Sequence, residues 1–138
     1  MKKLTKNVLS IEQAKIIAAE AISVAQAGSL KVAIAIVDDG GRLLYFERMD
    51  GVSWGSGEVA IAKALSAAAY QRDTSVFDER LVGGRMAVLQ QPFAFPIQGG
   101  LSLVSDGQCV GGIGASGALA QEDNEICKAA AAVLSRIT

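Results

Sequence analysis

The chain has 138 residues, which fits one domain able to bury about two thirds of the surface of its unfolded chain. It is 51% hydrophobic but only 5% aromatic, with 15 glycines, so its core must be built from small and branched aliphatic side chains. A net charge of −1 with interspersed charges excludes a basic surface for nucleic acid, and no apolar stretch fits a secretory signal or a membrane span. We therefore expect one cytoplasmic domain, residues 1–138.

The N-terminal part predicts a helix followed by a buried strand. Residues 10–28 begin with Ser10 and Gln13, which are spaced to form a capping box, and end at Gly28, expected to supply a left-handed exit. Residues 31–38 alternate large and small apolar side chains. Both faces of this strand are therefore expected to be covered, the small face by closely packed helices.

A hairpin and an alanine-rich helix follow. Asp39-Gly40 predicts a tight turn, from which residues 42–49 return as an antiparallel strand. A loop rich in glycine and serine then leads to Ser56, the expected cap of a helix that ends at about Gln71.

The C-terminal half repeats this order of elements. Ser75 and Asp78 predict a short capped helix at 74–84. Residues 101–117 then contain a strand, an Asp-Gly turn and a second strand, and residues 119–136 form the closing helix. The order strand, strand, helix thus occurs twice, which predicts an α+β fold with a single antiparallel sheet of about five strands flanked by helices.

Several motifs along the chain resemble the GlcG/HbpS family, which includes the haem-binding protein HbpS and the C-terminal domain of PduO-type cobalamin adenosyltransferases. The matching stretches are LSIEQAKIIAAEAI, VAIAIVDDGGRLLYFERMDG, AIAKALSAAA, FPIQGGLSLVSDGQCVGGIGASGA and QEDNEICKAA. The resemblance implies a profilin-like or roadblock-like domain that assembles into homo-oligomers. It also implies a functional association with diol, glycerol or glycolate catabolism, and haem or a corrinoid as the class of cofactor.

The chain departs from that family where haem would be ligated. Haem-binding members use histidine, and their hairpin commonly reads G-G-H-L, whereas this chain has Arg42 after Gly40-Gly41 and contains no histidine. A protonated guanidinium has no lone pair for iron. The remaining candidate iron ligands are Cys109, Cys127, Met49 and Tyr45, and each is interpreted as a core residue.

The charged end of the second strand is the first candidate ligand site. Arg48, Met49 and Asp50 precede Gly51, and strand alternation sends Arg48 and Met49 to opposite sides, so strand geometry alone does not place both in one pocket. Arg48 could meet an anionic group that Asp50 orients. The alternative is a strand-end ion pair worth at most about 1 kcal/mol.

Lys63 and a group of glycines complete the candidate ligand site. Helical geometry makes Lys63 a solvated residue by default, but an ammonium turned toward the strand end would form an anion site with Arg48. Missing side chains at glycines let a helix, a subunit or a flat ligand approach the sheet, and amides near the last helix could receive a carboxylate. The residues meant are Gly99, Gly100, Ser116 and Gly117.

Catalytic and metal constellations are not expected. Without histidine no serine or cysteine triad can form, and no carboxylates have the spacing of metal ligands. Glu122, Asp123 and Glu125 are interpreted as solvated charges on the first turn of the last helix.

Three hypotheses follow for the protein. The preferred one is a non-catalytic accessory domain that binds a small anionic or flat molecule, with haem or a corrinoid as candidates. An alternative is a small enzyme acting on a carboxylate- or carbonyl-bearing metabolite through Lys63, Arg48 and Asp50. The third is an oligomeric scaffold, because a chain this apolar is expected to bury surface against its own copies.

Overall fold

The computed structural model describes residues 1–137, which form an α+β domain around one antiparallel sheet with the strand order β2-β1-β4-β3. The strands are β1 (Ala33–Asp38), β2 (Leu43–Arg48), β3 (Gly100–Ser105) and β4 (Gln108–Ser116). The sheet has four strands, slightly fewer than the five or so expected. β1 is central, as its two apolar faces predict.

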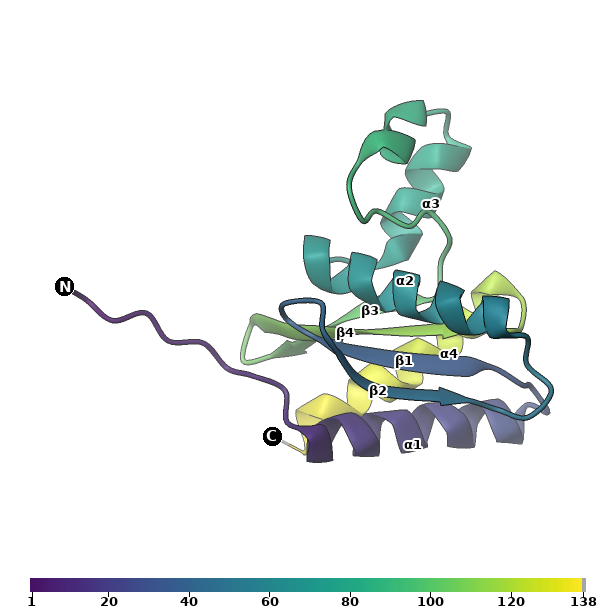
Figure 1. Ribbon diagram of the computed structural model, residues 1–138, viewed down its shortest axis with the longest axis horizontal. Helices are drawn as coiled ribbons and strands as arrows, with labels where there is room; N and C mark the ends of the chain where they lie inside the picture. Colours follow the sequence, from purple (N-terminus) through teal and green to yellow (C-terminus); the bar gives the residue numbers. More distant parts are fainter. Residues whose placement is uncertain (138) are drawn as a thin grey trace.

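Helices cover both faces of the sheet (Figure 1). Helices α1 (Ile11–Ala27) and α4 (Ala120–Val133) pack on one face, where the large aliphatic side chains of the core gather. Helix α2 (Trp54–Tyr70) packs on the other face, where the core consists almost entirely of alanine. The alternation of large and small residues in β1 therefore separates a thick core layer from a thin one.

Helix α1 confirms the predicted start but not the predicted exit. The Ser10 hydroxyl accepts from the Gln13 amide at 3.1 Å, and the Gln13 side chain accepts from the Ser10 amide at 2.9 Å, which completes the capping box. Gly28 has φ −90° and is not left-handed. The positive φ lies one residue later, at Ser29 (56°).

The first hairpin turns one residue later than predicted. Gly41 has φ +80°, whereas Asp39-Gly40 does not supply the positive φ angles. The Asp38 carboxylate accepts from the Arg42 amide at 2.9 Å, so a side chain closes this longer turn. A Cβ at Gly41 would also lie 2.5 Å from Leu65 of α2, so the turn packs tightly under the helix.

Two helix caps differ from prediction, and only one of the two helices is capped by a side chain. The Ser53 hydroxyl, instead of that of Ser56, caps α2 by accepting from the Ser56 amide at 3.2 Å. Helix α3 spans Thr74–Val82 and follows Asp73, so Ser75 is not its cap. The Asp78 carboxylate is used elsewhere, accepting from the Gln98 amide at 2.9 Å.

The glycines of β4 confirm that missing side chains let a helix approach the sheet. A Cβ at Gly112 would meet the carbonyl oxygen of Ala64, and one at Gly114 would meet that of Ala60. Both carbonyls belong to the backbone of α2. The helix therefore rests on the sheet through main-chain atoms, with almost no side-chain layer between them.

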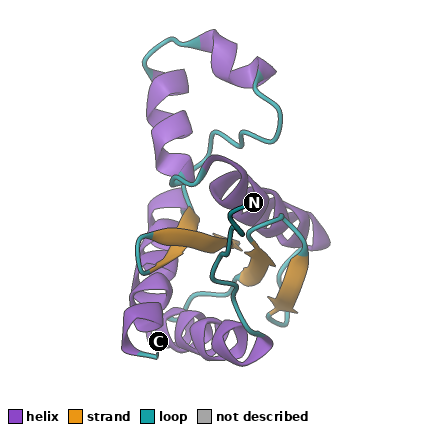
Figure 2. Cartoon of the chain, turned by 90° about the vertical axis from the view of Figure 1, so that its left-hand side faces the viewer, coloured by secondary structure: helices purple, strands orange, loops and turns teal. Residues whose placement is uncertain are grey.

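The segment between α2 and β3 projects from the body as an arm, residues 71–98, that contains α3 and the 3-10 helix η1 (Met86–Gln90) (Figures 1 and 2). At its base the Thr74 hydroxyl accepts from the Gly100 amide at 3.0 Å, and the Tyr70 and Phe77 rings meet edge to face at 5.1 Å. The arm carries several large apolar side chains that are exposed, namely Val82, Met86, Leu89, Phe93 and Ile97. No helix of the described residues is long and apolar enough to cross a membrane.

Candidate functional site

The end of β2 borders an open cavity of about 370 Å³, here called the strand-exit basin. It is lined by Ile22, Gln26, Lys31, Glu47, Arg48, Met49 and Asp50. Arg48 and Met49 thus line one cavity, which corrects the expectation that strand alternation would separate them. They can do so because the strand ends at Arg48 and the chain then turns, with Gly51 at φ +88°.

The two side chains are held in different ways. The Arg48 stem lies against Gly57 of α2, where an added Cβ would be 3.8 Å from Arg48 Cδ. The Met49 sulfur instead accepts from the Val32 amide at 3.4 Å and packs against the thick core. Among the described residues, Arg48 and Asp50 do not form the strand-end ion pair considered as an alternative.

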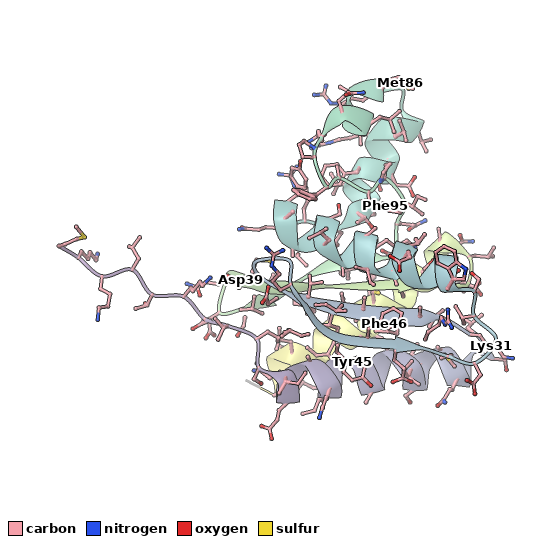
Figure 3. The ribbon with its side chains drawn as sticks, viewed as in Figure 1. Lys31, Asp39, Tyr45, Phe46, Met86 and Phe95 are labelled. Atoms are coloured by element: carbon pink, nitrogen blue, oxygen red, sulfur yellow. The ribbon has the colours of Figure 1, made fainter. Side chains whose placement is uncertain are left out.

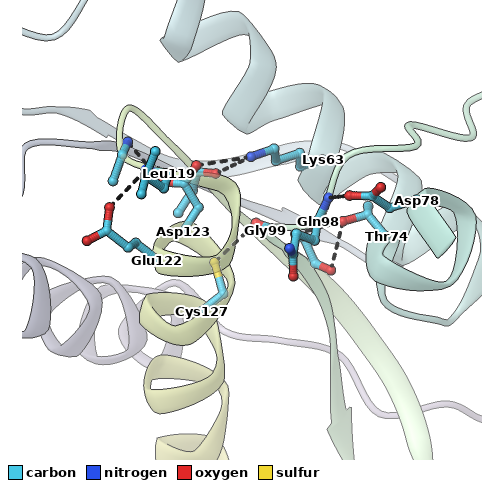
Figure 4. Close-up of polar contacts among 12 residues, drawn as sticks. Lys63, Thr74, Asp78, Gln98, Gly99, Leu119, Glu122, Asp123 and Cys127 are labelled. Carbon is cyan, nitrogen blue, oxygen red and sulfur yellow. Dashed lines mark hydrogen bonds and ion pairs between the residues drawn. The ribbon is translucent and has the colours of Figure 1, made fainter. Parts of the chain in front are cut away.

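Lys63 does not join this basin, because it is buried and paired elsewhere (Figure 4). Its side chain is 2% exposed, and its ammonium donates to the Ala115 carbonyl at 2.9 Å and to the Asp123 carboxylate at 3.3 Å. Both predictions for Lys63, a solvated side chain and an anion site shared with Arg48, are therefore wrong. The structure does not bring together the three residues of the enzyme hypothesis.

Asp123 is the partner that the sequence interpretation missed. Instead of decorating the surface of α4 it is buried, and its carboxylate also accepts from the Ala118 amide at 3.1 Å. Burial raises the pKa of Asp123, although the Lys63 ammonium and the Ala118 amide act in the opposite direction. The spacing of Asp123 on the buried side of α4, three residues before Ile126, was the signal that could have revealed it.

Two glycines of the candidate site, Gly99 and Gly100, lie against Lys63. A Cβ at Gly99 would lie 2.7 Å from the Lys63 nitrogen, and one at Gly100 would lie 2.5 Å from the Lys63 carbonyl oxygen. Ser116 is buried next to Ala115, and Gly117 has φ +137° against the backbone of Lys31. Two amides at the start of α4 are taken by carboxylates of the chain itself, that of Ala118 by Asp123 and that of Leu119 by Glu122 at 3.0 Å.

A second cavity of about 370 Å³, the hairpin cavity, lies between the first hairpin and α2. Its lining consists of Asp39, Gly40, Gly41, Arg42, Leu65, Ala69 and Phe93. Asp39 is paired with Lys6 at 2.7 Å, a hydrogen bond that lowers the pKa of Asp39, whereas Arg42 has no ion-pair partner among the described residues. Phe93 is 66% exposed and has φ +66°, a conformation that is rare for a bulky residue.

The two cavities lie at opposite ends of the β1–β2 pair. Figure 3 shows this through Lys31, which lines the strand-exit basin, and Asp39, which lines the hairpin cavity. Sequence reasoning found the basin through its charged residues. It missed Phe93 because nothing local in the loop predicts that this aromatic residue reaches the hairpin.

The remaining candidate iron ligands are engaged within the domain. The Tyr45 hydroxyl donates to Glu47 at 2.7 Å, and the Cys109 thiol donates to the Gly111 carbonyl at 3.3 Å. Burial raises the pKa of Cys109 and, more strongly, that of fully buried Cys127, whose thiol donates to the Gly99 carbonyl at 3.3 Å. Both cysteines are therefore thiols at neutral pH.

This thiol chemistry predicts slow labelling of the native protein. With a thiol-specific disulfide reagent at pH 7.5, Cys127 in a Cys109→Ser variant should react at least about tenfold more slowly than half-buried Cys109 in a Cys127→Ala variant. Both should react rapidly after denaturation. Equal rates in the native state would show that Cys127 is reached through an opening absent from this structure.

The fold and these cavities define a small α+β domain with an open antiparallel sheet and two surface sites. The family model described as "Haem degrading protein HbpS-like" matches residues 9–132. The chain is 38% identical to protein GlcG of Escherichia coli K12 over 132 residues, covering 96% of this chain and 98% of GlcG. The chain therefore belongs to the HbpS-like family.

Two solved structures of this family share the fold. The crystal structure of HbpS is 30% identical with a TM-score of 0.88, covering 97% of this chain and 95% of that one. The crystal structure of a PduOC:haem complex is 28% identical with a TM-score of 0.83, covering 91% of this chain and 94% of that one. These relatives support small-molecule binding.

Proposed function

We propose that this protein is a non-catalytic small-ligand-binding domain that holds one edge of a flat, anionic tetrapyrrole, haem or a corrinoid, in the hairpin cavity. The observation that carries the proposal is the exposed Phe93 ring in a left-handed backbone beside Arg42, which has no ion-pair partner within residues 1–137. An aromatic face can stack on a flat ring system, and a guanidinium can bind an anionic substituent of that ring system, a carboxylate or a phosphate. Leu65 and Ala69 supply an apolar wall.

The backbone of Phe93 supports a binding role. A bulky residue in this conformation costs about 1–3 kcal/mol and persists where the surrounding structure holds it. Here the neighbouring Phe95 amide donates to the Ser66 hydroxyl at 3.0 Å, and the Tyr70 hydroxyl donates to the Pro92 carbonyl at 2.5 Å. The loop is thereby fixed to α2, and an exposed ring is kept at the cavity although burial would be more favourable.

Iron ligation by histidine is closed to this chain, so binding should rest on stacking and charge. Relatives named for haem, HbpS-like proteins and the PduOC complex, make this ligand class the reasonable one to test. We also propose that the protein assembles into homo-oligomers through the exposed apolar arm. Its association with diol, glycerol or glycolate catabolism is part of the same proposal. Light scattering at micromolar concentration measures the assembly.

Titration with haem and with a cobalamin, followed by absorbance, tests the proposal. We expect stoichiometric binding of at least one of them, weakened by about threefold to tenfold in Phe93→Leu and in Arg42→Gln. Arg72→Gln, an exposed arginine outside the cavity, is the matched control and should bind as the unaltered protein does. No binding of either compound, or binding unaffected by both cavity variants, would contradict the proposal.

A gain of ligation locates the same site independently. Arg42→His restores the histidine of the family's G-G-H-L hairpin, so haem added to this variant should give the sharpened, shifted Soret band of an iron–imidazole bond. A spectrum unchanged from that of the unaltered protein would place the haem elsewhere.

A further inference from the structure

The strand-exit basin carries side chains of both charges that do not pair with one another. Lys31 and Arg48 contribute cations, and Glu47 and Asp50 contribute carboxylates, to one cavity of about 370 Å³. Among the described residues, no nitrogen of the two cations lies within 4.0 Å of either carboxylate. Glu47 is already occupied, because the Tyr45 hydroxyl donates to it at 2.7 Å.

The basin is also built by constraints on its walls. The Met49 amide donates to the Val32 carbonyl at 3.1 Å, and the Met49 sulfur accepts from the Val32 amide at 3.4 Å, which fixes this apolar side chain. A Cβ at Gly51 would lie 3.6 Å from the Lys31 nitrogen, so the Lys31 ammonium lies close over this turn.

The backbone at Lys31 is held from the other side. A Cβ at Gly117 would lie 2.6 Å from the Lys31 carbonyl oxygen, and Gly117 has φ +137°. Only a glycine fits there. The cation therefore projects from a closely packed crossing of two chain segments, whose backbone is fixed at Lys31.

Opposite charges held apart across one cavity match a ligand that carries both charges itself. Such a ligand replaces the water around each charge with an opposite partner, whereas a simple anion or cation would leave like charges close to it. The apolar Ile22 and Met49 provide a surface for a small aliphatic group, and Gln26 provides an amide.

We propose that the strand-exit basin binds a small zwitterion of the α-amino acid class. Its carboxylate lies between Arg48 and Lys31, its ammonium faces Asp50, and a small aliphatic side chain rests on Ile22 and Met49. This site is distinct from the hairpin cavity and lies at the other end of the β1–β2 pair. The tetrapyrrole proposal can fail while this one stands, and the reverse also holds.

Titrations of the full chain with glycine, L-alanine, L-valine and L-leucine, followed by amide chemical shifts in NMR, test the proposal. We expect at least one of them to shift the amides of residues 22–26 and 47–51 saturably. Acetate and methylammonium, which each carry one charge, should bind at least tenfold more weakly than that amino acid.

Two variants at exposed positions separate the charge contributions. Arg48→Gln and Asp50→Asn should each weaken binding of the amino acid at least tenfold, and Arg48→Lys, which keeps the charge, should recover part of the loss. Arg42→Gln at the hairpin cavity is the matched control and should leave amino acid binding unchanged, just as Arg48→Gln should leave haem binding unchanged. The far-UV circular dichroism of each variant verifies that the fold is retained.

Two results would overturn the assignment. The first is that none of the four amino acids shifts the basin amides, or that neither substitution weakens their binding. The second is that acetate binds as well as the best amino acid, because the basin would then be an anion site in which Asp50 has no part.

Discussion

Replacing Lys63 with methionine should lower the free energy of unfolding by about 3–5 kcal/mol, because Asp123 then remains buried without its cation. The two side chains are 2% and 3% exposed, and their charged atoms lie 3.3 Å apart. Methionine nearly preserves the volume of lysine, so the loss reports the charge and not a cavity. Urea denaturation followed by circular dichroism measures it.

The loss should depend on pH in a defined direction. Burial already raises the pKa of Asp123, and removing the Lys63 ammonium removes an influence that lowers it. A carboxyl whose pKa is raised by folding destabilises the fold increasingly as pH rises through that pKa. The deficit of Lys63→Met should therefore shrink as the pH falls from about 7 toward 4.

A double variant and a surface pair provide the controls. Lys63→Met combined with Asp123→Leu removes both charges and should recover most of the stability. The exposed pair of Lys128 and Glu125, 3.9 Å apart, should contribute less than about 1 kcal/mol when Lys128→Gln is made. A Lys63→Met protein as stable as the unaltered one at pH 7 would mean that the lysine is solvated after all.

Gly114→Ala is the second change with a large expected effect, a loss of about 3 kcal/mol or more that can prevent folding. The added Cβ would overlap the Ala60 carbonyl oxygen and lie 2.7 Å from the Ala64 nitrogen and 3.0 Å from Lys63 Cβ. Two of these atoms belong to the backbone of α2 and cannot rotate away. Soluble yield and melting temperature measure the loss.

Gly55→Ala, in helix α2, is the matched control. Gly55 lies in the first turn of α2, and its nearest neighbour, the Ser53 hydroxyl, would be 3.9 Å from the new Cβ. Alanine favours a helix by up to about 1 kcal/mol over glycine, so this variant should melt at the same temperature or higher. If Gly114→Ala has the same melting temperature as Gly55→Ala, then α2 does not rest on the sheet as closely as the structure shows.

The fold was largely predictable because its signals are local and repeated. The capping box at Ser10, the two apolar faces of β1 and the glycines of β4 each specify a backbone state or a packing distance within a few residues. The order of elements then leaves few sheet topologies open. The hairpin turn and the start of α2 were misplaced because the side chains of Asp38 and Ser53 bind the backbone groups there.

The candidate sites were only half predictable. The charges of the strand-exit basin follow one another in the sequence, so Arg48, Met49 and Asp50 could be found together. The pairing of Lys63 with Asp123 joins residues 60 positions apart on two helices. Helical periodicity gives the face of each helix but not the distance between faces, and only that distance decides whether a lysine is solvated or buried.

The backbone contact between α2 and β4 also sets the position of the helix along its own axis. Ala60 and Ala64 are four residues apart, a rise of about 6 Å in a helix, while Gly112 and Gly114 are two residues apart, about 6.6 Å along a strand. The spacing of these two helix residues thus nearly equals the spacing of the two glycines along the strand. Each of the two α2 carbonyls therefore lies over a glycine of β4. A slide of α2 by a single residue would break this match at both points, so main-chain periodicity determines the alignment of the helix where side-chain shape usually does.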